Sequence, residues 1–368
     1  MSFPEKELTY VKRRDCSTQV EILRKMASGQ APPTSTDPRL LFEIARVNKL
    51  LMHPGWPDLQ GDAAEQVNAE LNFGRMRGML SNNRGLKLAA EITEALDAGQ
   101  IPHLHLKGPL QQIRLYGTPL FKPSGDVDIL VAPKDRIAAG KILEEAGFKP
   151  TEAELGSWWV HFLGERHFEA PDQPIFVDLH HSVQQPGLPR PRNLVGFLHR
   201  AVRQSVANST LPVPSPPDMC LIAAITLCKA FLSHEPAGSV ALDMIKAFES
   251  LELAERDQLE QLARETGLSE TLDFAMALAT TSIGQDGLPP RSHELLADRS
   301  AETVRDMVFQ PWKQGLSFPR RREILASLCG RDLWRLVRES NRAFLSNAFL
   351  NVIARTRKPV GEVGETKR

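Results

Sequence analysis

Three aspartates in strand-like surroundings are the residues best suited to chemistry. Asp126 and Asp128 lie in the run Ser124-Gly-Asp-Val-Asp-Ile-Leu-Val131, and Asp178 lies in Phe176-Val-Asp-Leu-His180. Residues two apart in a strand point to the same face, so Asp126 shares a face with Asp128, and Asp178 shares one with His180. If the two strands are neighbours, about 4.8 Å apart, the three carboxylates converge. Such a patch repels itself and needs a cation, so the pattern predicts a divalent-metal site.

The elements that must position these acids alternate along the middle of the chain. The pattern predicts a strand over 103–106, a helix after Pro109, a strand over 127–131 and a helix over 134–146. Two further strands are expected near His167 and over 175–180. Helices mixed with short strands indicate an α/β (α+β) fold with a small mixed sheet.

Helical patterns flank this core on both sides. Residues 1–38 are polar at first and end in a proline-rich string, which predicts a flexible segment. The region 39–98 reads as helical, with breaks around 74–78 and 82–83 and an end near Gly99. We therefore expect an N-terminal helical region before a core that spans 99–210.

The second boundary is placed at a run of prolines. Leu211-Pro-Val-Pro-Ser-Pro-Pro217 favours an extended connection and predicts a domain hinge. Beyond it, 211–358 reads as a helical C-terminal domain, and 359–368 as a disordered tail.

Composition excludes several classes of protein. The chain has 368 residues, with 45 basic and 45 acidic side chains, so it is not an electrostatic nucleic-acid binder as a whole. Its four cysteines lack metal-ligand spacing and are expected to be reduced thiols. No apolar run approaches about 18 residues and the N-terminus lacks a signal-peptide pattern, so we expect a cytoplasmic protein without a membrane span.

A family resemblance becomes visible at the same residues. The order is Ile101-Pro-x-x-x-Leu-Lys-Gly, then Tyr116, then Gly125-Asp-Val-Asp-Ile-Leu-Val, then Glu144-Glu-Ala-Gly-Phe148, then Val177-Asp-Leu-His180. This order resembles an uncharacterised nucleotidyltransferase family of the superfamily whose best-known member is DNA polymerase beta. The similarity extends from the helices near Leu40 to the helix that begins Ser215-Pro-Pro-Asp-Met.

The resemblance implies a metal-dependent transfer at the three aspartates. Asp126 and Asp128 would ligate Mg²⁺ (or Mn²⁺) on the triphosphate of an NTP, and Asp178 would complete the site. Two metals about 3.5–4 Å apart can bind the attacking and the leaving oxygens of an in-line displacement at phosphorus. Either Asp128 or Asp178 could receive the proton of the acceptor hydroxyl.

The resemblance also implies nucleotide contacts around the aspartates. Lys107 and Gly108 would form the phosphate-binding turn, with Lys122, Gly125 and His180 as further contacts. The superfamily usually has Gly-Ser at this turn, whereas Pro109 follows the glycine here. Lys107 and the backbone amides of the following helix must then supply the phosphate contacts. The family tends to have Arg near Lys122, and Lys keeps the charge without the bidentate fork.

Each assignment has a structural alternative. The paired acids could be solvated residues of an exposed sheet face, Lys107-Gly108 an ordinary turn, and His180 the donor of a structural hydrogen bond. His103 and His105 are more typical of packing than of zinc binding, and His161 and His167 could line the site. Trp158 and Trp159 could stack on a base or fill the core.

A basic stripe is predicted near the C-terminus. Residues 311–368 include 13 basic and 5 acidic side chains. Arg331, Arg335, Arg338 and Arg342 follow helical spacing opposite Leu333, Leu336 and Val337. The stripe could hold a polyanion, an acidic partner or the triphosphate, or it could be a solvated helix face.

The expected function is transfer of a nucleoside monophosphate from an NTP, with release of pyrophosphate. The expected acceptor is a hydroxyl or phosphate of a small molecule, a sugar phosphate or a peptide natural product. Toxin-like relatives modify RNA 3′ ends or protein side chains, which makes these the competing acceptors. A catalytically silent nucleotide-binding scaffold, with a helical C-terminal domain that binds a protein, is the alternative from another class.

Overall fold

The computed structural model describes residues 10–151, 156–171, 174–284, 288 and 291–356. Its centre is a five-stranded mixed sheet in the order β1-β2-β5-β4-β3, which confirms the predicted fold class. The strands are β1 (His103–His105), β2 (Asp126–Val131), β3 (Lys149–Pro150), β4 (Glu165–Glu169) and β5 (Phe176–His180). The β2–β5 pair is parallel and the other pairs are antiparallel.

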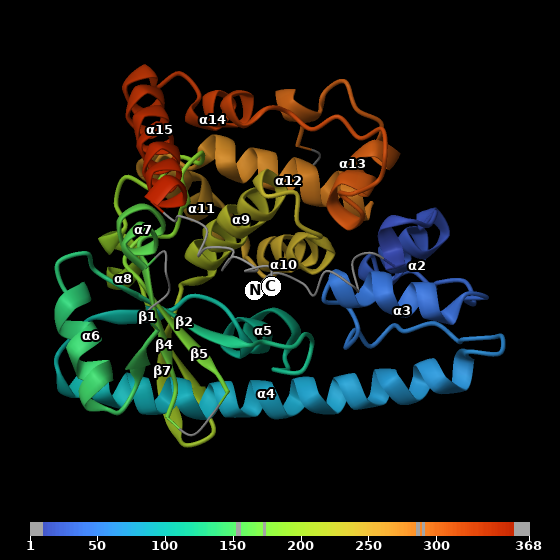
Figure 1. Cartoon of the computed structure of the whole chain (residues 1–368), viewed down its shortest axis with the longest axis horizontal. Helices are drawn as coiled ribbons and strands as arrows, with labels where there is room; N and C mark the ends of the chain where they lie inside the picture. The colour runs from blue at the N-terminus through green and yellow to red at the C-terminus, as the bar shows by residue number, and fades with distance from the viewer. Residues whose placement is uncertain (1–9, 152–155, 172–173, 285–287, 289–290, 357–368) are drawn as a thin grey trace, which may run out of the picture.

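The two faces of the sheet pack on different sets of helices (Figure 1). Val127, Ile129 and Val131 of β2 share a buried cluster with residues of α4 (Ala64–Ala98) and α6 (Arg136–Glu145). Leu104 and Leu130 belong instead to the large cluster formed with the C-terminal helices. The predicted alternation along β2 is therefore confirmed, and the aspartate face looks toward the C-terminal helices.

The N-terminal segment is more ordered than the sequence predicts. Within the predicted flexible segment 1–38, the chain forms α2 (Ser17–Ala27). Val20, Leu23 and Met26 lie at helical spacing and are buried in the large cluster, so the prediction of flexibility was wrong for this part. A second helix, α3 (Pro38–Val47), begins at Pro38, with Asp37 as its N-cap.

Helix α4 is continuous where breaks were predicted. Its 35 residues run along the lower edge of the molecule, beneath both the sheet and α3 (Figure 1). Gly78 lies in a close contact with Met52, and Asn82 is fully buried. These residues serve tertiary contacts, and a helix tolerates them because packing outweighs local propensity.

The proline-rich run 211–217 is not a hinge. Leu211 and Val213 are buried in β7 (Ser209–Val213), which pairs with β6 (Val202–Val206) in a hairpin. Ser215 then caps α9 (Pro216–Leu232), and Pro216 occupies the first turn, where a proline has no amide hydrogen bond to lose. The prolines therefore fix a strand end and a helix start.

The remaining elements complete the core and the upper layer in Figure 1. In the core these are α5 (Pro109–Tyr116), α7 (Gly156–Trp158), the π-helix η1 (Trp159–Leu163) and α8 (Val195–His199). Above it lie α10 (Gly238–Glu249), α11 (Leu253–Thr266), α12 (Ser269–Ile283), η2 (Glu294–Leu296), α13 (Ala301–Phe309), α14 (Arg321–Cys329) and α15 (Leu333–Thr356). The predicted tail 359–368 lies outside the described residues.

The predicted basic stripe is turned inward in part. Arg335 is buried and donates to the Gly267 and Arg190 carbonyls, and Arg342 donates to the Phe162 and Gln184 carbonyls. Arg338 remains exposed beside Glu339. The predicted stripe was therefore wrong as a single solvated face, because backbone carbonyls of neighbouring segments accept hydrogen bonds from two of its guanidinium groups.

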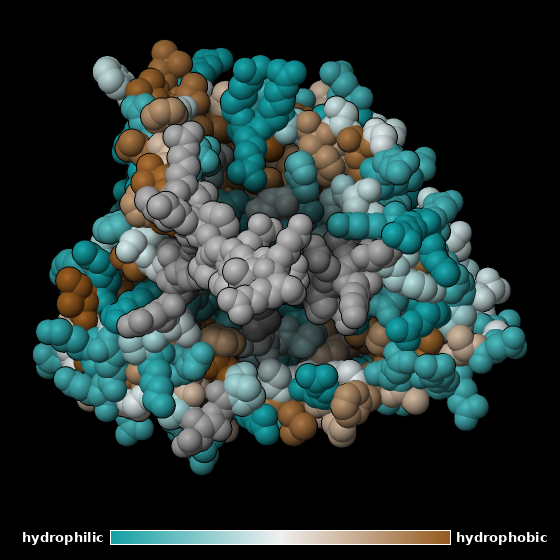
Figure 2. Space-filling model, in the orientation of Figure 1, coloured by the Kyte–Doolittle hydropathy of each residue, from teal (hydrophilic) through white to brown (hydrophobic). Residues whose placement is uncertain are grey.

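Large hydrophobic side chains are exposed on α15 as well, beside polar ones such as Arg338. They are Leu333, Trp334, Val337, Phe344, Leu345 and Val352. Figure 2 shows hydrophobic residues gathered over the upper left of the molecule, where α15 lies.

Two expectations from composition concern the whole chain. All four cysteines are free and buried, as expected of reduced thiols. In the described part of the chain, no helix is long and apolar enough to cross a membrane.

Candidate active site

One row of polar side chains crosses three neighbouring strands. Asp128 of β2 lies opposite Asp178 of the parallel strand β5, and Asp178 lies opposite His167 of β4. The next row contains His180 opposite Glu165. Since residues directly opposite in a sheet share a face, the strand register brings two of the predicted carboxylates together.

Asp128 is the most enclosed member of the row. It is 1% exposed, and its Oδ1 atom accepts from His180 Nε2 at 2.9 Å and lies 3.0 Å from Lys107 Nζ. Burial alone would raise the pKa of Asp128, but the Lys107 ammonium and the His180 imidazole hold it well below its usual range. Asp128 is therefore an ionised carboxylate.

The imidazoles form a second layer of contacts. His167 Nδ1 lies 2.6 Å from Asp178 Oδ1, and the Trp159 ring meets the His167 ring edge-on at 4.0 Å between centroids. Glu165 Oε2 lies 3.4 Å from His180 Nδ1. Although burial alone would lower it, the pKa of His180 is raised by the Asp128 carboxylate and by Glu165. Asp178 and His180 are thus oriented by β4.

Asp126 begins β2 and lies apart from the densest cluster. The atoms that approach within 4.8 Å of one another belong to Asp128, Asp178 and His180. The Asp128 charge, followed by burial, raises the pKa of Asp126. The carboxylates therefore repel one another, as the sequence predicts for such a patch.

The Lys107-Gly108 turn lies directly beside Asp128. The Leu106 amide donates to the Asp128 carbonyl at 3.0 Å, which places Lys107 at the edge of the site. Although burial alone would lower it, the Asp128 and Asp126 carboxylates raise the pKa of Lys107. Gly108 has φ +86, and a Cβ there would come within 3.3 Å of Ser124 Oγ. Glycine is required at this tight turn, and Pro109 follows as the first residue of α5.

Two other predicted nucleotide contacts are placed differently. Lys122 forms an ion pair with Asp243 of α10, which also accepts from the Tyr116 hydroxyl at 2.7 Å. Gly125 is exposed immediately before β2. Nucleotide contact by Lys122 would thus compete with Asp243, and its role stays a prediction.

Several residues near the site were missed or weighted too low by the sequence. His167 and Glu165 repeat the alternation of the neighbouring strands, so the signal was an acid and a histidine two apart in a strand. Asp243 comes from a distant helix and has no local signal. His105 faces away from Asp128 and bonds Thr93 Oγ1 of α4 at 2.8 Å, which fits the expected packing role.

The donor set fits a hard divalent cation. Asp128 Oδ2 is buried without a hydrogen-bond partner among the described residues. Carboxylate oxygens are the protein ligands that Mg²⁺ prefers, and Asp178 offers more of them nearby. Metal binding by the aspartates stays a prediction, and His180, which donates to Asp128 Oδ1, would orient that carboxylate.

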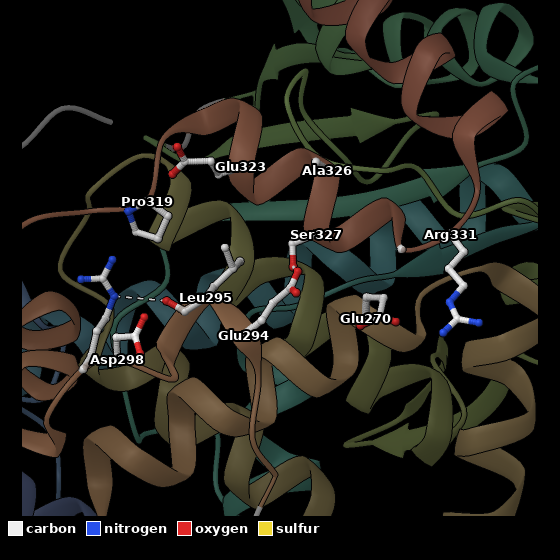
Figure 3. A pocket seen from close by; sticks show the side chains of 11 residues that line it. Glu270, Glu294, Leu295, Asp298, Pro319, Glu323, Ala326, Ser327 and Arg331 are labelled. Atoms are coloured by element: carbon white, nitrogen blue, oxygen red, sulfur yellow. Dashed lines mark hydrogen bonds between the residues drawn. The ribbon is translucent and has the colours of Figure 1, made fainter.

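A separate cavity of about 840 Å³ lies among the C-terminal helices (Figure 3). Glu270, Glu294, Asp298 and Glu323 line it, together with Arg299 and Arg331. None of the predicted active-site residues contributes to its lining.

A sequence comparison shows which family the chain matches. Residues 60–284 match the sequence profile of a family described as an uncharacterised nucleotidyltransferase. No curated protein matches the chain.

Two solved structures are similar to parts of the chain. One is the antibiotic-resistance factor ANT(2'')-Ia, with 13% identity and a TM-score of 0.35 over 50% of this chain and 92% of that chain. The other is an antigenic nucleotidyltransferase-like protein from Paracoccidioides brasiliensis, with 14% identity and a TM-score of 0.32 over 52% of this chain and 93% of that chain.

Proposed function

We propose, because the chain belongs to the uncharacterised nucleotidyltransferase family, that it transfers a nucleoside monophosphate from an NTP to an acceptor hydroxyl or phosphate and releases pyrophosphate. Family membership supports nucleotidyl transfer in general. Use of Mg²⁺ or Mn²⁺ and a small-molecule, sugar-phosphate or peptide acceptor are our additions. The observation that carries the proposal is the parallel pairing of β2 with β5, which sets Asp128 opposite Asp178 beside Lys107.

In this proposal the aspartates bind the metal and Lys107 binds the phosphates. Asp126, Asp128 and Asp178 would hold Mg²⁺, which when bound would neutralise the charge of the triphosphate and lower the pKa of the attacking hydroxyl. Lys107 adds a fixed positive charge beside the phosphates. Positioning of the reactants and charge neutralisation account for most of the rate enhancement of such a transfer. The protein therefore needs no covalent intermediate.

The role of proton acceptor falls to Asp178. Because Lys107 and His180 hold the pKa of Asp128 well below its usual range, Asp128 is a weak base. In the His167 tautomer that carries its proton on Nδ1, this nitrogen donates a hydrogen bond to Asp178 Oδ1. The bond fixes the position of the Asp178 carboxylate beside Asp128. We assign the proton of the attacking hydroxyl to Asp178.

Pyrophosphate release provides the test. The protein is incubated with each NTP, with Mg²⁺ or Mn²⁺, and with panels of small-molecule, sugar-phosphate, peptide, RNA and protein acceptors. We expect release that needs the divalent ion and that falls by roughly 1,000-fold in Asp126→Asn and Asp128→Asn, because charge stabilisation is lost. Asp62→Asn, at an exposed position in the turn before α4, is the matched control.

The outcomes separate the candidate functions. NTP binding without pyrophosphate release under any condition would indicate a nucleotide-binding scaffold. Labelled RNA or protein as the product would support the same chemistry with a toxin-like acceptor. Release that is unchanged in both aspartate variants would contradict the assigned site.

A further inference from the structure

A lysine outside the family-matched region 60–284 lies in a segment that neighbours the loop before Asp126. Lys49 follows α3 and has φ +56, a left-handed conformation that a residue with a Cβ adopts rarely. Its amide donates to the Arg46 carbonyl and that of Leu50 to the Ala45 carbonyl, which closes the end of the helix. The backbone thus turns sharply at Lys49, directly after the end of α3.

The residue before Lys49 is fixed to the C-terminal helices. Asn48 is fully buried, and its amide nitrogen donates to the Ile44 and Phe309 carbonyls at 2.9 Å. Its side-chain oxygen accepts from the Gly238 amide at 3.0 Å, and its carbonyl accepts from the Ser239 amide at 3.2 Å. The direction of Lys49 is therefore set by bonds to α10 and to the end of α13.

The segment that carries Lys49 packs against the loop before Asp126: the His53 and Phe121 rings meet edge-on at 5.1 Å between centroids, and Met52 and Pro123 both border Gly78. Burial lowers the pKa of Lys49, the neighbouring Lys122 and Lys107 lower it further, and Asp126 and Glu235 oppose this effect. The side chain nevertheless remains accessible to solvent. It is thus partly enclosed on the side of the site where Asp126 lies.

Lys49 differs from the two other lysines by its lack of a partner. Lys107 pairs with Asp128, and Lys122 pairs with Asp243. Among the described residues, Lys49 makes no ion pair or side-chain hydrogen bond. Its charge is therefore available to an anionic ligand that enters from solvent.

We propose that Lys49 binds the β- or γ-phosphate of the NTP and supports the negative charge of the leaving pyrophosphate. The inference rests on the proposed function and adds a residue outside residues 60–284, the region matched by the family. A lysine binds phosphate as a point charge, and it acts where charge develops on the leaving group. Lys49 thus discriminates an NTP from the corresponding NMP, which lacks both of these phosphates.

Because the backbone at position 49 is left-handed, variants can remove the charge of Lys49 without changing the backbone conformation. Lys49→Asn and Lys49→Gly remove the charge but keep the conformation, because both residues tolerate positive φ. Lys49→Arg keeps the charge. Lys141→Asn, on the exposed face of α6, is the matched control. We expect Lys49→Gly to raise the melting temperature while it weakens nucleotide binding.

Calorimetric titration of each NTP and each NMP, with Mg²⁺ present, measures the effect. We expect Lys49→Asn and Lys49→Gly to weaken binding of the preferred NTP by roughly 10- to 100-fold, the range of a lost hydrogen bond to a charged group. NMP binding should change less than about twofold, and Lys49→Arg should restore most of the NTP affinity. Where turnover is measured, KM for the NTP should rise and kcat should fall, because Lys49 both binds the phosphates and supports the charge of the leaving pyrophosphate.

The possible results separate this inference from the proposed function. Equal NTP affinity in wild type and in the folded Lys49 variants overturns the role of Lys49, even if Asp128→Asn abolishes pyrophosphate release. Equal loss of NTP and NMP affinity overturns recognition of the β- or γ-phosphate. A wild-type protein that binds no NTP overturns both proposals.

Discussion

The ammonium of Lys107 occupies the place beside Asp128 where a cation is needed. Asp128 is buried, whereas 42% of the Lys107 side chain is exposed. The pair thus has one end in the protein interior and one end open to solvent and ligands. Lys107 therefore stabilises the carboxylate patch, and in the proposed function it also supplies charge to an incoming phosphate.

The first prediction at the scale of the residue is that Lys107→Met makes stability depend on divalent cations. The variant leaves Asp128 with His180 as its charge partner, which should cost about 1–3 kcal/mol of unfolding free energy. This is less than for a fully buried pair because Lys107 is partly exposed. Mg²⁺ should recover part of the loss, since it binds the folded state. Urea unfolding with and without Mg²⁺ measures both effects.

Lys134→Met, at an exposed position before α6, is the control for this experiment. Its stability should stay within about 0.5 kcal/mol of wild type, with the same response to Mg²⁺ as wild type. A Lys107→Met protein whose stability does not respond to Mg²⁺ would argue against a cation at these aspartates.

The sequence could place the acids on a face but could not identify all their partners. The two-residue period of a strand is enough to put Asp126 beside Asp128 and Asp178 beside His180. That His167 contacts Asp178 depends on β4 pairing with β5, and Asp243 reaches Lys122 from a helix far along the chain. Contacts that depend on strand order and helix docking cannot be predicted from the local periodicity of the sequence.

At the scale of the element, α4 holds the segment that leads into the active site. Asn82 donates to the Pro119 and Lys122 carbonyls and accepts from the Ser124 amide at 2.8 Å. Gln112 of α5 accepts from the Phe121 and Lys122 amides. The two amide side chains thus fix the loop that precedes Asp126.

The sequence marked Asn82 and Asn83 as a helix break because asparagine competes with helical hydrogen bonds in isolated segments. Here the Asn82 side chain finds partners on another segment, so the helical backbone bonds are kept. Local propensity therefore misplaced the break, although it correctly identified an unusual position.

We predict that Asn82→Ala destabilises the protein by about 2–4 kcal/mol, because several buried backbone groups lose their partners at once. The adjacent Asn83 is exposed, so Asn83→Ala is the matched control and should be neutral or slightly stabilising. Urea unfolding compares the two. Equal stability of the two variants would show that the loop does not depend on this contact.

At the scale of the whole molecule, one buried cluster joins the ends of the described chain. It includes Val11 near the N-terminus, Leu130 of the sheet and Leu328 of α14. The predicted boundary at 210/211 falls inside the β6–β7 hairpin. Sequence composition identified the helical character on each side, but contacts between distant segments decide whether they fold separately.

The last helix is attached to the core by Arg342. Its side chain is 9% exposed and donates to the Phe162 and Gln184 carbonyls, while burial lowers its pKa to about 10. We predict that Arg342→Ala lowers the unfolding free energy by about 2–4 kcal/mol, because two carbonyls and Glu339 lose a donor.

Arg338 provides the comparison on the same helix. Its side chain is 58% exposed, so Arg338→Ala should change the unfolding free energy by less than about 0.5 kcal/mol. Thermal and urea unfolding measure both variants. Similar losses in the two would contradict the inward attachment of α15 and favour a general role for its positive charge.

The residues that hydrogen-bond to the Asn48 side chain are synthesised late, long after Asn48 itself. Asp126, Asp128 and Asp178 have all left the ribosome well before Gly238 and Phe309, the partners that fix Asn48. A nascent chain therefore contains every aspartate that we propose to bind metal while Asn48, next to Lys49, still lacks its partners. The nucleotide site that we propose would thus be complete only after most of the C-terminal helices have been made.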